Sequence, residues 1–428
     1  MPSLAVDLEF RGLVHQITDP GLLPKLDAGG MTVYAGFDPT ADSLHVGSLL
    51  QLCTLRRLQR AGHRPIALAG GATGVVGDPG GKTEERPFLS DEQLRANLEG
   101  IRPQLERFLD FSADAGSSRA ILVDNADWFR EMRLLSFMRE VGKHITVNQM
   151  IAKESVRSRI DRPDHGISFT EFSYMLLQGY DFMHLFDLYG CTLQIGGSDQ
   201  WGNITVGTEL IRKVRGEEVF GLTTPLVLKA DGTKFGKTES GNVWLDARRT
   251  SPYQLYQFLL RSDDAVVGSY LRYLTFLDHP TILELDEQTK THPEARSAQT
   301  ALAREVCTIV HGEAQTAKAE RAAGALFSEK ISSLDEATFL EVCADAPSID
   351  VARNEFDTSG LSLVDALVRT GLARSKSQAR TTIGQGGAYV NNRRVGDPDA
   401  RLGSDDLIYD RYVVLRRGRR DYHLLRFV

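Results

Sequence analysis

The first 230 or so residues alternate short apolar runs with amphipathic stretches, the pattern of parallel strands joined by helices. The runs predicted as strands are TVYAGFD (32–38), PIALAGG (65–71), AILVD (120–124), TLQIGG (192–197) and PLVLK (225–229). Between them, apolar residues recur with helical spacing at 48–62 and 203–216. We therefore expect an α/β fold with an open parallel sheet over residues 1–230.

The pattern changes twice after this region. From Ser251 to Phe327 the strand signal disappears, so we expect residues 231–344 to be mostly helical. DAPSIDVARNEFDTSG (345–360) has little periodicity and several turn residues, and is predicted to be a linker. The start of 361–428 reads as two short helices, a turn and a strand, which indicates a small α+β domain.

Composition is that of a globular chain: 428 residues suit two or three domains, and no apolar run approaches the ~18 residues of a membrane span. The N-terminus lacks the basic and apolar regions of a signal peptide. The four cysteines (Cys53, Cys191, Cys307 and Cys343) are far apart, with no C-x-x-C pair, and are interpreted as reduced core residues rather than metal ligands. We expect a cytoplasmic protein with no metal site and no membrane partner.

The net charge of −7 is unevenly spread. Residues 361–428 carry 13 Lys and Arg against 7 Asp and Glu, whereas the rest of the chain carries 37 against 50. This asymmetry favours a polyanionic partner for the C-terminal domain.

Two segments nearly match a Walker A phosphate loop. GTKFGKT (232–238) has three residues between its glycines where the motif requires four, and GDPGGKT (77–83) fails in the same way at Val76. A P-loop ATPase or kinase is therefore disfavoured. Lys82 and Arg86 still give the glycine-rich segment two cations that could close over a polyphosphate, although a solvated surface loop explains it equally well.

Polar residues follow several predicted strands. In open parallel sheets, ligands bind at the carboxyl ends of strands, where helix N-termini attract phosphates. The segment 34–52 contains Thr40 and His45, which can donate to phosphate oxygens, and Gly47, where a flat ligand could approach the backbone. GGSDQWGN (196–203) follows another strand at the same edge. A capped helix start with a solvated histidine remains the alternative for the first segment.

The stretch 167–190 is predicted to be one helix. Tyr174, Gln178 and Asp181 are spaced i, i+4 and i+7, so they share one face. Aromatic stripes usually belong to the core, but burying an unpaired amide or carboxylate costs about 1–3 kcal/mol. A polar binding surface is therefore the better interpretation.

Together these stretches resemble bacterial-type tyrosyl-tRNA synthetases, which are class I aminoacyl-tRNA synthetases. YAGFDPTADSLHVGS resembles their HIGH region, GGATGVVGDP the following strand and loop, SYMLLQGYD and GGSDQWGN the amino-acid pocket, and KFGKT their KMSKS signature. The likeness extends over almost the whole chain. It implies a Rossmann-like catalytic domain (1–230), a helical anticodon-side domain (231–344) and, after the linker, an S-four-type RNA-binding domain (361–428).

The resemblance also implies an activity. Tyrosine and ATP would form tyrosyl-adenylate and pyrophosphate, and the tyrosyl group would pass to the 3′-terminal adenosine of tRNA(Tyr). ATP would enter as its Mg²⁺ complex, and the protein would be a homodimer that binds no DNA. Because the substrate carboxylate is the nucleophile, the enzyme must supply positioning and positive charge rather than a base.

Site residues follow from the resemblance. Those implied in catalysis are Thr40, His45, Lys82, Arg86, Lys234, Lys237 and Thr238. ATP would also contact Asp38, Gly47, Asp199 and Lys237. Tyr34 and Asp181 would bind the phenol of tyrosine, Asp78, Tyr174 and Gln178 its ammonium group, and Asn125, Asp199 and Gln200 would complete the pocket. Arg374, Lys376, Arg380, Arg393 and Arg394 would bind tRNA phosphates.

Two positions depart from the family pattern, and both concern ATP affinity. Ser48 replaces the second histidine of HIGH, and Ala35 stands where some relatives have cysteine. Among rival functions, tryptophanyl-tRNA synthetase shares the fold and signatures but lacks the C-terminal module, and Tyr34 with Asp181 favours a phenol. A non-enzymatic RNA-binding protein would leave the segment SYMLLQGYD and both GKT loops without a purpose.

Overall fold

The computed structural model describes residues 2–78, 89–160, 166–238, 241–325, 329–344, 346–353, 360–418 and 421–428. Internal contacts divide the chain into two units. The first comprises Met1–Ser251 and Leu259–Val310, and the second comprises Pro252–Phe258 and His311–Val428. The predicted helical segment, 231–344, is thus shared between the two units.

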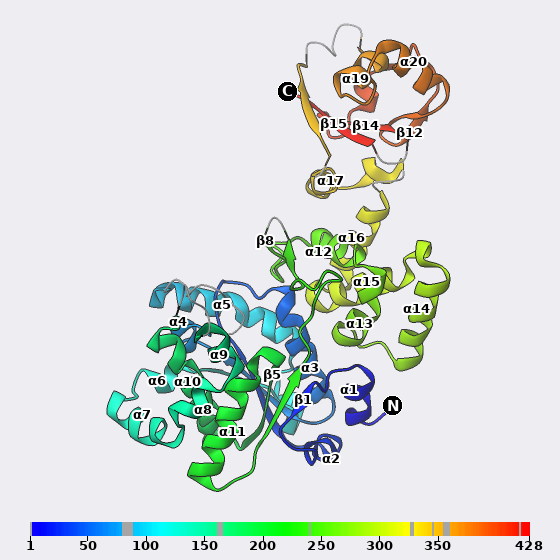
Figure 1. Cartoon of the computed structure of the whole chain (residues 1–428). Coiled ribbons are helices and arrows are strands. Elements are labelled where there is room, and N and C mark those ends of the chain that lie inside the picture. The colour runs from blue at the N-terminus through cyan, green and yellow to red at the C-terminus, as the bar shows by residue number, and fades with distance from the viewer. Residues whose placement is uncertain are drawn as a thin grey trace. The chain divides into compact units, whose positions relative to one another are not determined.

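The first unit is built on a six-stranded sheet (Figure 1). Its strands, in spatial order, are β1 (Gln16–Ile17), β6 (Phe220–Thr224), β5 (Cys191–Gly197), β2 (Thr32–Phe37), β3 (Arg64–Ala69) and β4 (Ile121–Asp124). Only β1 is antiparallel to its neighbour. This confirms the predicted α/β class with a Rossmann-like parallel sheet.

From the two central strands, β2 and β5, the chain continues toward opposite edges of the sheet, because β3 lies beside β2 on one side and β6 lies beside β5 on the other. Helix α3 (Leu49–Arg60) connects β2 to β3, and α11 (Trp201–Arg215) connects β5 to β6. Because such crossovers are right-handed, the two helices lie on opposite faces of the sheet. The face under α11 and α10 (Phe169–Tyr189) carries a core that includes Tyr34, Ile66 and Phe182.

Close packing fixes α10, the helix that carries much of the candidate site. Where α10 crosses α11, a Cβ added at Gly179 would lie 3.0 Å from Val206, and one at Gly207 would lie 2.9 Å from Phe182. Two glycines therefore let the helix backbones approach. Ser168 caps the N-terminus of α10 by accepting from the Glu171 amide, and Gly190 ends it in the left-handed conformation.

The other elements of the first unit surround this framework. The helices are α1 (Leu4–Phe10), α2 (Leu22–Ala28), α4 (Thr73–Val76), α5 (Asp91–Phe108), α6 (Ala126–Phe129), α7 (Leu134–Glu140), α8 (Val147–Ile151), α9 (Glu154–Ile160), α13 (Asp264–Leu274), α14 (His279–Thr291) and α15 (Ser297–His311), whose last residue falls in the second unit. Helix α12 (Pro252–Leu260) is divided between the units, and β7 (Lys237–Thr238) pairs with β8 (Gly241–Asn242).

The second unit contains a five-stranded sheet in the order β12 (Arg393–Val395), β11 (Ala388–Val390), β14 (Tyr412–Arg417), β15 (Asp421–Phe427), β9 (Ser348–Val351). It also contains α16 (Glu313–Ala325), α17 (Glu336–Val342), β10 (Leu361–Ser362) paired with β13 (Arg401–Leu402), α19 (Leu363–Arg369) and α20 (Lys376–Gly384).

Alternation along β14 gives this sheet two covered faces. Val413 and Leu415 join the core formed with α19 and α20, whereas Tyr412 and Val414 join a second cluster with Phe339 of α17. The segment before the predicted linker is therefore part of the C-terminal fold.

Most predicted elements are confirmed, with two differences. PLVLK (225–229) is not a strand of the main sheet; the strand is FGLTT, immediately before it, and PLVLK forms one arm of a hairpin with the signature segment. The predicted linker, 345–360, contains β9, which pairs in parallel with β15. These four residues form a strand despite their weak periodicity because β15 provides backbone hydrogen-bond partners along its edge.

Candidate active site

The carboxyl ends of three parallel strands bring several of the predicted residues to one edge of the sheet. Asp38 follows β2, Asn125 follows β4, and Asp199 with Gln200 follows β5. The neighbours β2 and β5 continue to opposite sides of the sheet, so their carboxyl ends form a topological switch point, where open α/β sheets bind ligands.

A buried carboxyl group lies beside this edge. Asp181 on α10 is 2% exposed and accepts hydrogen bonds from Asn125 Nδ2 at 3.1 Å and from Trp128 Nε1 at 2.9 Å. Burial raises the pKa of Asp181 to about 8 despite these two hydrogen bonds, which act in the opposite direction. Tyr34 on β2 is 1% exposed, and burial followed by the charge of Asp181 raises its pKa well above the usual value.

A chain of hydrogen bonds leads from Asp181 along the strand ends. The Asn125 amide that donates to Asp181 also donates to Thr73 Oγ1 at 2.9 Å. Thr73 Oγ1 donates to Asp38 Oδ1 at 3.0 Å, and Tyr174 Oη donates to Asp38 Oδ2 at 3.2 Å. Predicted residues from three separate segments, joined by Thr73, thus form one polar surface.

A second chain joins three further predicted residues. Gln200 Nε2 donates to Asp78 Oδ2 at 2.5 Å. Asn203 Nδ2 donates to Gln200 Oε1 at 3.2 Å and to Gln178 Oε1 at 3.1 Å. The groups predicted to receive an amino acid's ammonium are therefore oriented by neighbours that hold their oxygen atoms in place.

The start of α3 supplies the next part of the site. His45 precedes the 3₁₀ turn Val46–Ser48, and its Nδ1 accepts from the Gly47 amide at 3.0 Å. Because Nδ1 is the acceptor, the neutral ring carries its proton on Nε2. A Cβ added at Gly47 would lie 2.7 Å from the imidazole, so a larger residue here would displace the His45 ring from this position. His45 thus caps the start of the helix, which is the alternative that the sequence left open for this segment. Contacts of His45 and of the exposed Thr40 with phosphate stay predictions.

The signature segment GTKFGKT forms a hairpin with PLVLK. Lys229 N donates to Thr233 O at 2.8 Å, and Phe235 N donates to Val227 O at 3.1 Å. Asp231 Oδ1 accepts from the Thr233 amide at the turn. We call residues 227–236 the signature hairpin.

Backbone hydrogen bonds place this hairpin beside the start of α3. Val243 N donates to Gly236 O at 2.9 Å, and Val46 N donates to Val243 O at 3.0 Å. Lys234 also interacts electrostatically with Asp199, which follows β5. Loss of hydration and then the Asp78 carboxylate raise the pKa of Asp199, while Lys234 acts to lower it.

Some predicted residues are not placed in full. Lys82 and Arg86 lie outside the described residues, and only the backbone of Lys237 and Thr238 in β7 is described. Their roles stay predictions.

The predicted tRNA contacts lie on the second unit. Arg374 and Arg393 are exposed, Lys376 Nζ pairs with Asp365 at 2.7 Å and Arg380 pairs with Asp399 at 3.2 Å. Arg394 has a structural contact as well, because its guanidinium donates to the carbonyls of Gln385 and Gly386 after α20.

Three residues of the polar chains escaped the sequence reasoning: Thr73, Trp128 and Asn203. Trp128 follows Asn125 by one helical turn, and Asn203 follows Gln200 by another, so the i, i+3 spacing next to a predicted site residue was the available signal. Thr73 offered no such signal, because its partners come from other strands.

Within the described ranges, no group of three or more His, Cys, Asp or Glu side chains is arranged to hold a metal ion. The four cysteines are free and buried, as predicted. Across the same ranges, every helix is too short or too polar to span a bilayer.

Comparison with known families gives two matches that together cover most of the chain. Residues 27–328 match the family described as tRNA synthetases class I (W and Y). Residues 340–425 match the tyrosine–tRNA ligase SYY-like C-terminal domain.

Individual relatives agree. The chain is 56% identical over 428 residues to the tyrosine–tRNA ligase of Roseiflexus castenholzii, covering all of both chains. It is 50% identical over 427 residues to that of Geobacillus stearothermophilus, covering 99% of this chain and 100% of the relative. Among solved structures, a C-terminally truncated mitochondrial tyrosyl-tRNA synthetase from Aspergillus nidulans aligns with a TM-score of 0.68 at 33% identity, over 76% of this chain and 95% of the other.

Proposed function

The chain belongs to the class I tyrosyl-tRNA synthetases, and from this premise we propose that its site activates L-tyrosine with ATP and then transfers the tyrosyl group to tRNA(Tyr). The observation that carries the proposal is the buried pair Tyr34 and Asp181 beside a polar strand edge. A phenol both donates and accepts a hydrogen bond, and the pair offers a hydroxyl and a carboxyl group to match it. An indole N–H only donates, so the pair favours tyrosine over tryptophan.

The remaining residues suit adenylate formation. Asp78, Tyr174 and Gln178 would orient the ammonium group, which places the tyrosine carboxylate to attack the α-phosphate of ATP. ATP would enter as its magnesium complex. Lys234 and Lys237 would stabilise the charge that develops as pyrophosphate leaves, from the segment that lies beside the helix start at His45.

Tyrosine-dependent exchange of pyrophosphate into ATP tests this function. We expect exchange with tyrosine and not with tryptophan or phenylalanine. Tyr34→Phe removes one hydroxyl and should reduce the preference for tyrosine over phenylalanine about tenfold, measured as the ratio of kcat/KM values. Equal exchange with tryptophan, or an unchanged ratio in the variant, would contradict the assignment.

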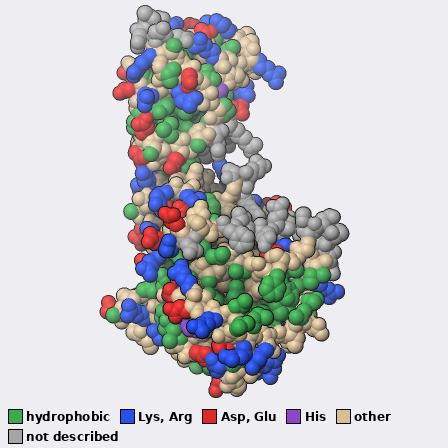
Figure 2. Space-filling view, turned by 90° about the vertical axis from the view of Figure 1, so that its left-hand side faces the viewer, with side chains coloured by type: hydrophobic (Ala, Val, Ile, Leu, Met, Phe, Trp, Pro, Cys, Tyr) green, Lys and Arg blue, Asp and Glu red, His purple; other side chains and the backbone are tan. Residues whose placement is uncertain are grey.

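We further propose that two copies of the chain associate through an apolar face of the first unit. Figure 2 shows hydrophobic side chains gathered on one side of this unit. The exposed large apolar residues of α7 to α10 are Leu134, Leu135, Met138, Val147, Ile151, Ile160, Phe169 and Leu188. A gathering of exposed apolar side chains is typical of an association site, and a two-fold axis would cover it with its own copy.

Light scattering coupled to gel filtration tests the dimer. Leu135, 81% exposed, is the most exposed member of this face, so Leu135→Asp should produce monomers. Leu283→Asp is the control, because this residue is 52% exposed on α14, far along the chain from the face. Monomeric wild-type protein, or a dimer that survives Leu135→Asp unweakened, would refute the interface.

The basic residues of the second unit are proposed to hold the tRNA. The cytoplasmic location and the absence of DNA and membrane partners remain predictions.

A further inference from the structure

Tyr270 on α13 contacts both arms of the signature hairpin. Its hydroxyl donates to Leu228 O at 2.7 Å, and its ring packs against Phe235 with centroids 4.6 Å apart. Both rings are nearly buried, at 3% and 6% exposure. Phe235 lies between Lys234 and Lys237 in the sequence, so its packing against Tyr270 helps to fix the backbone of the segment that carries both lysines.

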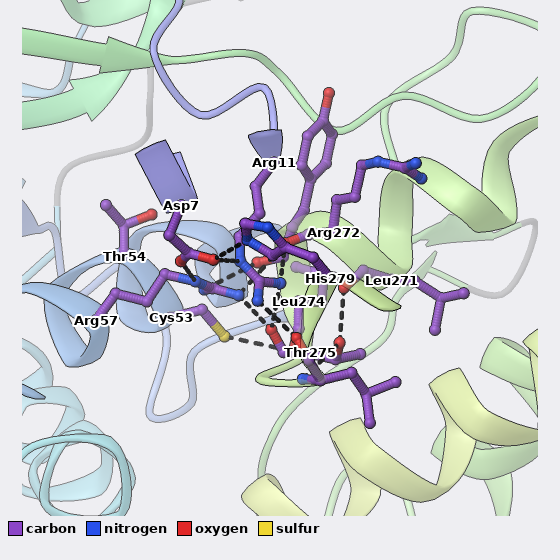
Figure 3. A network of polar contacts seen from close by, with 12 residues as sticks. Asp7, Arg11, Cys53, Thr54, Arg57, Leu271, Arg272, Leu274, Thr275 and His279 are labelled. Carbon is purple, nitrogen blue, oxygen red and sulfur yellow. Dashed lines mark hydrogen bonds and ion pairs between the residues drawn. The ribbon is translucent and has the colours of Figure 1, made fainter. Parts of the chain in front are cut away.

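Helix α13 is in turn held at its C-terminus by two arginines (Figure 3). Arg11 of α1 donates to the carbonyls of Arg272 at 3.1 Å, Thr275 at 3.2 Å and Leu277 at 2.6 Å. Arg57 of α3 donates to the carbonyls of Arg272 and Tyr273, each at 3.3 Å, and also to Thr275 O. The last carbonyls of a helix lack partners within it and favour cations, so these bonds fix the helix end.

Asp7 balances the buried positive charge. It pairs with Arg11 at 2.8 Å, with Arg57 at 3.7 Å and with His279 Nε2 at 2.8 Å. Arg11 and Arg57 are only 4% and 5% exposed, so this carboxylate offsets part of the cost of removing two guanidinium groups from water.

Helix α3 is connected to both parts of the proposed ATP site, the turn at His45 and the signature hairpin. Helix α3 begins directly after the His45–Gly47 turn and carries Arg57 near its end. Arg57 fixes α13, and α13 presents Tyr270 to the hairpin. Through α3 and α13, the position of the hairpin is therefore tied to the position of the helix start.

We infer that Tyr270 is a positioning residue for adenylate formation, which sets the signature hairpin against the His45 turn, and that Arg57 is the clamp that holds its helix. The inference rests on the proposed function only in treating Lys234 and Lys237 as ATP ligands. Tyrosine binds to other elements in that proposal, so a fault in this linkage should affect ATP and leave tyrosine affinity intact.

Tyr270→Phe removes the hydrogen bond to Leu228 and keeps the ring. We expect kcat/KM for ATP in pyrophosphate exchange to fall about fivefold to tenfold, with the dissociation constant for tyrosine unchanged. Tyr270→Leu also removes the ring contact and should lower it further. Tyr273→Phe is the matched control, because it makes the same change on the same helix and, among the described residues, the Tyr273 hydroxyl has no hydrogen bond in the structure.

Variants of the clamp complete the test. Arg57→Gln should weaken ATP kinetics in the same direction, and Arg57→Lys, which restores the charge, should recover part of the loss. If Arg57→Gln fails to fold, the Tyr270 and Tyr273 comparison alone decides. Equal ATP kinetics in Tyr270→Phe and Tyr273→Phe, or a parallel loss of tyrosine affinity, would overturn the inference while an active wild-type enzyme upheld the proposed function. A wild-type chain that fails to exchange pyrophosphate would refute both.

Discussion

At the scale of single residues, the carboxyl group of Asp181 couples the site to stability. Burial raises its pKa from about 4 to about 8 in the folded chain, so folding favours the protonated form. The stability linked to this group is present in full below pH 4 and is lost as the pH rises through 8. The unliganded protein should therefore become easier to unfold between pH 5.5 and pH 8.5.

Asp181→Asn tests this pH dependence. Asparagine cannot ionise, so the midpoint of thermal unfolding should fall less between pH 5.5 and pH 8.5 in the variant than in the wild type, although the variant is less stable at pH 5.5 because one donor loses its acceptor. Scanning calorimetry at both pH values measures the difference. Parallel pH profiles would show that Asp181 does not titrate in this range.

Residue types at strand ends and on one helix face were readable from the sequence, whereas the bonds between them were not. Tyr174 and Asp181 were identified by their spacing on α10. Thr73 was not, because its importance comes from accepting a hydrogen bond from Asn125 and donating one to Asp38, and these partners lie 52 and 35 positions away. Such a role depends on the order of strands in the sheet, which local patterns do not encode.

At the scale of elements, the two glycines of GTKFGKT have different structural roles. Both have positive φ, 79° at Gly232 and 87° at Gly236. A Cβ at Gly232 would meet nothing within 4 Å, but one at Gly236 would lie 2.3 Å from Val46 Cγ2. Alanine at either position incurs strain of about 1 kcal/mol, and only alanine at Gly236 also pushes the hairpin away from the helix start.

We therefore expect Gly236→Ala to lower kcat/KM for ATP by at least about tenfold and Gly232→Ala to have a clearly smaller effect. Steady-state pyrophosphate exchange with varied ATP measures both. Similar losses in the two variants would mean that backbone strain, rather than contact with Val46, controls the hairpin.

Strands with a clear pattern of apolar residues were predicted well, whereas a strand with a weak pattern could be located only from its pairing in the structure. The alternation of apolar runs located β2, β3, β4 and β5 to within about two residues. The pattern misplaced β6, because FGLTT is rich in glycine and threonine while PLVLK looks more like a strand. Leu226 and Leu228 are 39% and 40% exposed, so neither belongs to the core of the sheet.

At the scale of the whole molecule, the second unit limits how its function can be tested. Ile331 and Phe339 pack against the C-terminal sheet, where they contact the cluster that includes Tyr412 of β14 and Leu424 of β15. A truncation at residue 350 would cut β9 and expose these side chains, so loss of activity in such a variant would not isolate RNA binding. Single charge reversals avoid this difficulty.

Arg393 on β12 and Arg411 beside the second cluster are both exposed arginines of this unit. Arg393→Glu should weaken aminoacylation of tRNA(Tyr), reduce the dependence of tRNA affinity on salt by about one unit of slope and leave pyrophosphate exchange unchanged, because the proposed site of adenylate formation belongs to the first unit. Arg411→Glu makes the same change of charge next to Ile408 and Tyr412, in the cluster that packs on α17, and should preserve charging. Nitrocellulose filter binding at several salt concentrations, together with charging assays, separates the two. Equal effects would mean that net charge attracts the tRNA, whereas a loss confined to Arg393→Glu would locate its path on the side of α20 and β12.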